Sequence, residues 1–105
     1  MNKAMNKVMV AAVAGVLIGL SGTAMAAADA AAGKTKALSC GGCHGTEGMS
    51  PNPEWPNLAK QNAAYLVKQL KDFRAGTRVD PMMQGMAAPL SDADIEDLAA
   101  YFAGL

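Results

Sequence analysis

Apolar residues run almost without interruption from position 8 to position 20, and polar residues are interspersed regularly only after that run. Lys3 and Lys7 stand before the apolar run, and the short stretch Ala24-Met25-Ala26 follows it. A basic start, an apolar middle and a small-x-small end are typical of a secretory signal peptide. The pattern therefore marks the first part of the chain as a targeting segment, and the folded domain is expected after it.

We predict a signal peptide over residues 1–26 and one small domain over residues 27–105. Cleavage after Ala26 and cleavage after Ala27 both fit the small residues at the junction. The apolar run of about 13 residues is shorter than the roughly 20 that a membrane-spanning helix needs, so we expect no stable membrane insertion. An uncleaved signal that tethers the protein is the alternative. Export would place the domain in the periplasm.

Within the predicted domain, the spacing of apolar positions is helical in three places. Residues 29–39 predict a short helix and residues 61–75 a longer one, with Gly76 as its C-terminal cap. A third helix is expected from Ser91, where Asp94 completes an acidic variant of the capping box. The positions that share one side of the two later helices are Tyr65, Leu66, Gln69, Leu70 and Phe73, and Ile95, Leu98, Ala99 and Phe102.

The two segments between these helices are rich in glycine and proline. We interpret residues 40–56 and residues 77–90 as loops, because these residue types interrupt regular structure. No part of the chain shows the alternation of a strand or an internal repeat. The predicted fold class is therefore all-α.

Charge and size narrow the choice of function. Residues 27–105 hold seven Lys or Arg and nine Asp or Glu, so the predicted domain is near −2 and has no basic footprint for nucleic acid. A domain of this size buries a modest core and often needs a metal, disulfides or a large cofactor to be stable. The two cysteines of the chain lie close together and indicate which of these applies.

The candidate chemistry is the motif Cys40-Gly41-Gly42-Cys43-His44. Two thiols at C-x-x-C spacing can each add to a haem vinyl group, and the histidine that follows can ligate the iron. A zinc site would need a second pair of ligands, a thioredoxin-like motif would need a neighbouring βαβ unit, and a disulfide here would close only a very short loop. We therefore predict covalent haem c on Cys40 and Cys43, with His44 as an iron ligand.

A second axial ligand would decide how the iron is used, and methionine is the candidate residue type. Met49 lies too soon after His44 to reach the opposite face easily. The spacing of Met82, Met83 and Met86 in the second predicted loop leaves all three open as ligands.

Three stretches together resemble the class I bacterial cytochromes c: CGGCHGTEG, PEWPNLAKQNAAYLVKQLKDFRAG and MMQGMAAPLSDADIEDLAAYFAGL. The resemblance covers nearly all of the domain and is strongest to either half of the tandem dihaem cytochromes of bacterial respiratory chains. It implies a small cytochrome c fold in which three to four helices surround one covalently attached haem. The relatives carry two such domains, and we expect this chain to act with one haem.

The resemblance also implies residue roles. The family's ligand methionine stands a few residues before the PLS that opens the last helix, which makes Met83 the ligand here and Met82 and Met86 the reserve candidates. The carbonyl of Pro56 is expected to accept the second ring N–H of His44.

Further roles are implied for the surroundings of the haem. Trp55 is expected to form part of the haem pocket. Lys60 and Arg78 are candidates to pair with the haem propionates, with a solvated surface charge as the open alternative for each. In this family small residues of the first helix cross the last helix at close range, which predicts a contact of Gly33 and Ala37 with Leu98 and Tyr101.

The function expected from these features is periplasmic one-electron transfer in a respiratory chain, and the chain is not expected to be an enzyme. The implied redox partners are an electron donor such as a bc-type complex and an acceptor such as a terminal oxidase or reductase. Two alternatives stay open: an enzyme or gas sensor with an open iron position, and a fixed subunit of a larger complex. Methionine ligation argues against the first.

Overall fold

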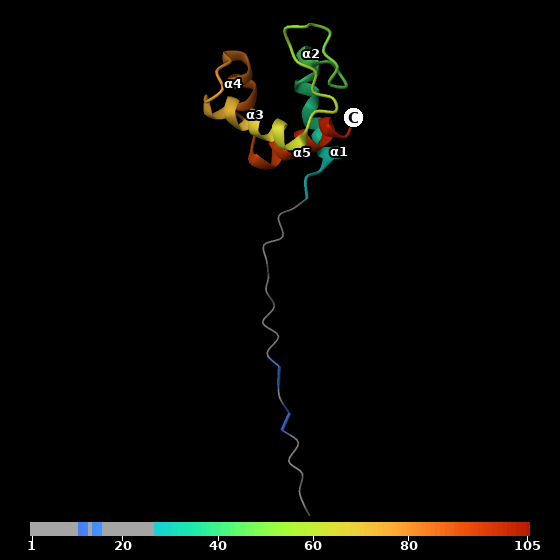
Figure 1. Ribbon diagram of the computed structural model, residues 1–105, viewed down its shortest axis with the longest axis vertical. Helices are drawn as coiled ribbons and strands as arrows, with labels where there is room; N and C mark the ends of the chain where they lie inside the picture. The colour runs from blue at the N-terminus through green and yellow to red at the C-terminus, as the bar shows by residue number, and fades with distance from the viewer. Residues whose placement is uncertain (1–10, 13, 16–26) are drawn as a thin grey trace, which may run out of the picture.

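The computed structural model describes residues 11–12, 14–15 and 27–105, so the predicted signal peptide lies almost wholly outside the described residues. The described elements are α1 (Ala30–Lys36), the 3₁₀ helix η1 (Ala37–Ser39), α2 (Gly41–His44), α3 (Ala63–Ala75), α4 (Pro81–Ala87) and α5 (Asp92–Ala103), shown in Figure 1. Since this part of the chain contains helices and no strand, the predicted all-α class is confirmed.

Two short helices lie in segments predicted as loops, so the described residues form more helices than the three to four expected. In α2, the amides of Cys43 and His44 both donate to the carbonyl of Cys40, which closes one helical turn. In α4, Pro81 occupies the first turn and the Asp80 side chain accepts from the amides of Met82 and Met83. Proline in the first turn and aspartate at the N-cap favour a helix start, so a proline in the segment interpreted as a loop instead begins a helix.

The core forms where α1 and α3 pack against α5. Gly33 of α1 is buried, and a Cβ built on it would lie 2.0 Å from the Asp97 carbonyl oxygen and 2.9 Å from Tyr101 Cβ. The two helix backbones therefore approach more closely than any side chain at position 33 permits. The buried residues of the core cluster are Ala37, Leu66, Leu98, Ala99 and Phe102. The predicted close crossing of the first and last helices is present.

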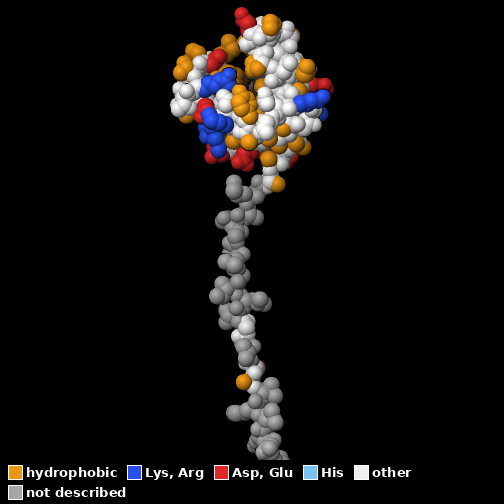
Figure 2. Space-filling view, in the orientation of Figure 1, with side chains coloured by type: hydrophobic (Ala, Val, Ile, Leu, Met, Phe, Trp, Pro, Cys, Tyr) orange, Lys and Arg blue, Asp and Glu red, His pale blue; other side chains and the backbone are white. Residues whose placement is uncertain are grey.

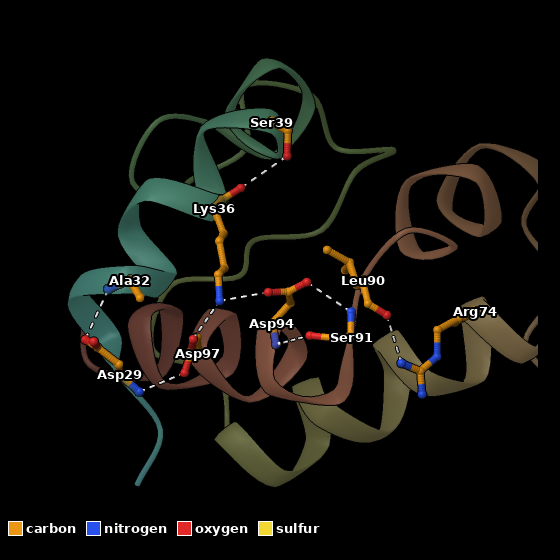
Figure 3. Close-up of polar contacts among 9 residues, drawn as sticks. All are labelled: Asp29, Ala32, Lys36, Ser39, Arg74, Leu90, Ser91, Asp94 and Asp97. Carbon is orange, nitrogen blue, oxygen red and sulfur yellow. Dashed lines mark hydrogen bonds and ion pairs between the residues drawn. The ribbon is translucent and has the colours of Figure 1, made fainter. Parts of the chain in front are cut away.

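Charged groups hold the same two helices together at their edge (Figure 3). The Lys36 ammonium lies 2.8 Å from Asp94 Oδ1 and 2.7 Å from Asp97 Oδ2. Asp97 also accepts from the backbone amide of Asp29 at 2.8 Å, and Asp94 forms the predicted capping box with Ser91. One lysine thus links α1 to two successive turns of α5.

Substitution of Gly33 tests the close crossing. We expect Gly33→Ala to lower the free energy of unfolding by at least about 2 kcal/mol, because the added methyl group meets backbone that cannot move away without separating the helices. Gly42→Ala is the matched control, since Gly42 is helical and exposed and its added Cβ meets nothing within 4 Å. Urea unfolding of both proteins measures the difference, and equal stability of the two would contradict the assignment.

The pH dependence of stability tests the Lys36 contacts. The hydrogen bond from Lys36, with help from Ser91, lowers the pKa of Asp94 to about 2 from the ordinary value of 3.8. Because the folded-state pKa is the lower one, Asp94 stabilises the fold above about pH 4, and this contribution disappears as the pH falls towards 2. Asp94→Asn should therefore lose less stability than the unsubstituted protein between about pH 4 and 2 in urea unfolding. Identical pH profiles would contradict this interpretation.

Candidate functional site

The single turn of α2 brings the three residues of the motif to one side of the chain. Cys40 and Cys43 are three apart and Cys40 and His44 are four apart, which are the spacings at which helical side chains are neighbours. His44 is buried, with 7% of its surface exposed, and both cysteines are partly buried. The predicted loop in this segment is thus a helical turn that aligns two thiols with an imidazole.

One hydrogen bond fixes the orientation of the His44 ring. Its Nδ1 lies 2.8 Å from the carbonyl oxygen of Pro56, the contact that the resemblance implied. A carbonyl oxygen can only accept, so Nδ1 carries the proton and Nε2 keeps a free lone pair. The imidazole is therefore held in the tautomer that a metal ligand requires.

The loop between α2 and α3 brings Pro56 to this position. Gly45 has a φ of 85°, and an added Cβ would lie 2.0 Å from the Met49 carbonyl oxygen, so the loop turns back immediately after His44. The amide of Ser50 donates to Asn57 Oδ1 at 2.6 Å, which joins the two sides of the loop next to Pro56. Residue types alone gave no indication of the Ser50–Asn57 contact, because it joins side-chain and backbone groups seven residues apart.

Both cysteines are free thiols, so the disulfide alternative does not describe this structure. Burial raises the pKa of the Cys40 thiol, and a hydrogen bond with Ser39 offsets this rise only in part. The thiol is therefore held in its neutral form near neutral pH, and it lies beside the apolar core cluster.

The three candidate methionines all lie on α4. Met82 and Met86 are exposed, with 59% and 42% of their surfaces accessible, whereas Met83 is only partly exposed. Met49, at 63%, is exposed on the loop after α2. Met83 is therefore the most enclosed of the four, which favours it over the reserve candidates.

The other predicted residues lie in different settings. Trp55 is half-buried and lines an open hollow of about 360 Å³ formed by its own loop, and the three motif residues do not line it. The Arg78 guanidinium lies 4.5 Å from the centre of the Phe73 ring and donates to Gln69. Lys60 is exposed and has a left-handed backbone, with a φ of 63°. The pocket role of Trp55 and the propionate contacts stay predictions.

The segments that carry His44 and Met83 stand apart in space. In Figure 1, α2 and the loop after it lie on one side of the domain and α4 lies on the other, with α3 and α5 below both. Figure 2 shows the surface hollowed between these two parts, with hydrophobic side chains at the recess. A flat, largely apolar group with a metal at its centre suits such a position.

The donor groups fit haem c. Two free thiols at C-x-x-C spacing can form the two thioether bonds, and the buried imidazole offers Nε2 to the iron. A thioether on α4 is available for the second axial position.

Among the described residues no helix has the length and apolar character needed to cross a membrane.

The comparisons with known proteins agree with this chemistry. The sequence profile of the family "Cytochrome c" matches residues 30–105. Cytochrome c4 of Pseudomonas aeruginosa is 50% identical over 99 residues, which cover 94% of this chain and 48% of that protein. Cytochrome c-554(548) of Halomonas halodenitrificans is 47% identical over 79 residues, which cover 72% of this chain and 95% of that protein.

A solved structure gives the same result for the fold. The crystal structure of reduced recombinant cytochrome c4 from Pseudomonas stutzeri superposes with a TM-score of 0.70 at 49% sequence identity, over 73% of this chain and 45% of that one. The chain thus spans about half the length of the cytochromes c4 that it matches.

Haem c, attached covalently through a Cys-x-x-Cys pair, is the prosthetic group of the matched family, and Cys40 and Cys43 supply that pair. The predicted cytochrome c fold and cofactor are therefore confirmed. With a profile match over residues 30–105 and relatives near half identity, the chain belongs to the cytochrome c family.

Proposed function

We propose that this chain is a one-electron carrier whose haem iron is ligated by His44 and Met83. The observation that carries the proposal is the 2.8 Å contact between His44 Nδ1 and the Pro56 carbonyl, because it leaves Nε2 free in a buried, oriented ring. A ring held in this way keeps its position when the charge of a bound metal changes. Little rearrangement between two charge states is what electron transfer requires.

The bound haem would supply the chemistry, since its iron changes oxidation state by one electron. The residues of the chain would supply its position and surroundings: Cys40 and Cys43 would attach the macrocycle, and His44 and Met83 would be the two protein ligands of the iron. Iron held by both ligands would have no open place for oxygen or a peroxide. This arrangement favours a carrier over the open-site enzyme or sensor.

The same proposal assigns Met83 as the second axial ligand. Its support is the partial enclosure of Met83, compared with the exposed Met82 and Met86, together with its place before the turn that opens α5. A thioether ligand raises the reduction potential relative to a second histidine or to water. Trp55 is proposed as part of the wall at the loop edge of the haem.

The sequence also supports a proposal for the cellular compartment and the redox partners of this carrier. A signal peptide over residues 1–26 would export the domain to the periplasm, where haem c is attached and the carrier meets its partners. We propose a respiratory donor such as a bc-type complex and an acceptor such as a terminal oxidase or reductase. The near-neutral charge favours brief docking without strong steering by the whole molecule.

Absorption spectra of the protein, exported together with a haem-attachment system, test the proposal. We expect c-type bands that survive acid–acetone extraction, and a weak far-red sulfur-to-iron band in the oxidised form. Met83→Ala should remove the far-red band and leave the covalent haem in place, because the thioether ligand is lost and the attachment is not.

Met82→Ala and Met86→Ala are the matched controls on the same helix, and both should keep the far-red band. Loss of the band in one of these instead of Met83→Ala would move the ligand to that residue. Covalent haem without the band in the unsubstituted protein would contradict methionine ligation, and absence of covalent haem would contradict the proposed function itself.

Export is tested on the same material. N-terminal sequencing of the periplasmic holoprotein should show a chain that begins at Ala27 or Ala28, because cleavage is expected after Ala26 or Ala27. A chain that retains Lys3 and Lys7 and sediments with the membrane would favour the tethered alternative.

A further inference from the structure

The segment that carries Met83 is held in place by little apolar burial. Among residues 77–89, Ala87 is the one buried residue and Met83 the one partly buried residue, while the others are exposed. Segments with few buried contacts open at low cost, so contacts at the two ends of this segment determine how firmly it stays closed.

One side chain joins those two ends. Arg74, in the last turn of α3, donates through Nη1 to the carbonyl oxygen of Leu90 at 2.9 Å (Figure 3). Its Nη2 donates to Asp92 Oδ1 at 2.6 Å. Arg74 stands just before the segment, and Leu90 and Asp92 stand just after it. The guanidinium therefore spans the base of the segment with two donors in a fixed planar geometry.

The other polar contacts near the base act on one end only. The backbone amide of Arg78 and the hydroxyl of Thr77 both donate to the carbonyl of Asp72, which ties the beginning of the segment to α3. The amide of Leu90 donates to the Ala87 carbonyl, a contact within the end of the segment. Among the hydrogen bonds of the described residues, those of Arg74 are the ones that connect α3 with Leu90 and the first turn of α5.

We propose that Arg74 is a positioning residue for the methionine ligand: by closing the base of segment 77–89 it holds the thioether of Met83 at the iron. This inference rests on the proposed function, since it takes Met83 as the axial ligand. The bond to the Leu90 carbonyl carries more of the effect than the pair with Asp92, because Asp92 is largely exposed and exposed ion pairs are weak.

A competing iron ligand measures this effect directly. Imidazole added to the oxidised holoprotein can occupy the axial position only when Met83 leaves it, so its apparent affinity rises with the ease of opening the segment. We expect Arg74→Leu to bind imidazole about tenfold more tightly than the unsubstituted protein, as followed by loss of the far-red band, because a hydrogen bond from a charged donor is lost.

Lys36→Leu is the matched control. Lys36 also pairs with carboxylates of α5, but it joins α1 to α5 and has no contact with segment 77–89 in the described hydrogen bonds. A general loss of stability would change both variants alike, whereas positioning predicts that Lys36→Leu binds imidazole within about twofold of the unsubstituted protein. Equal shifts in the two variants, or no shift in Arg74→Leu, would overturn the proposal.

Two further variants separate the two bonds of the guanidinium. Asp92→Asn keeps the bond to Leu90 and should change imidazole affinity less than Arg74→Leu. Arg74→Lys keeps the charge but not two donors in one plane, and about a threefold shift is expected; it replaces Arg74→Leu in the test if that protein does not assemble. A far-red band that is missing from the unsubstituted protein contradicts the proposed ligand, whereas a band that resists imidazole equally in all variants contradicts only the role of Arg74.

Discussion

The close crossing of α1 and α5 is the constraint on which the rest of this domain depends. Gly33 lets the backbones meet where any Cβ would overlap the Asp97 carbonyl. The chain runs from this crossing through η1 directly into α2. The position of the crossing therefore determines where Cys40 and His44 lie. A small domain with a modest core gains a fixed attachment site from one helix pair in this way.

The proposed iron ligand of α2, His44, needs a second contact that fixes its ring, and the loop after α2 provides that contact. Left alone, an imidazole can rotate and exchange its proton between two nitrogens. The Pro56 carbonyl removes both freedoms, and the fold of the loop at Gly45 and between Ser50 and Asn57 brings that carbonyl to the ring. A proline, which has no amide to donate, still contributes through its backbone oxygen.

Much of this arrangement could be predicted from the sequence, and the exceptions have physical causes. Apolar spacing indicates α3 and α5 because both bury one face, and the C-x-x-C-H spacing indicates the attachment site because few other uses fit it. The helices α2 and α4 were predicted as loops, since one is a single turn and the other begins at Pro81. The contacts of Arg74 were not predicted at all, because a hydrogen bond across 16 residues leaves no periodic signal.

The acidic residues of α5 connect the two halves of the site. Asp94 and Asp97 bind Lys36 from the helix that leads to His44, and Asp92 binds Arg74 beneath the segment that holds Met83. The helix before His44 and the base of the Met83 segment therefore both contact the same short stretch of α5. Neither α2 nor α4 contributes much to the buried core, so the place of the Met83 segment depends on the Arg74 contacts at its base, while the Lys36 pairs hold α1, the helix that leads to the attachment site, against α5. The small rearrangement that the proposed electron transfer requires would then rest on contacts that lie outside the haem site.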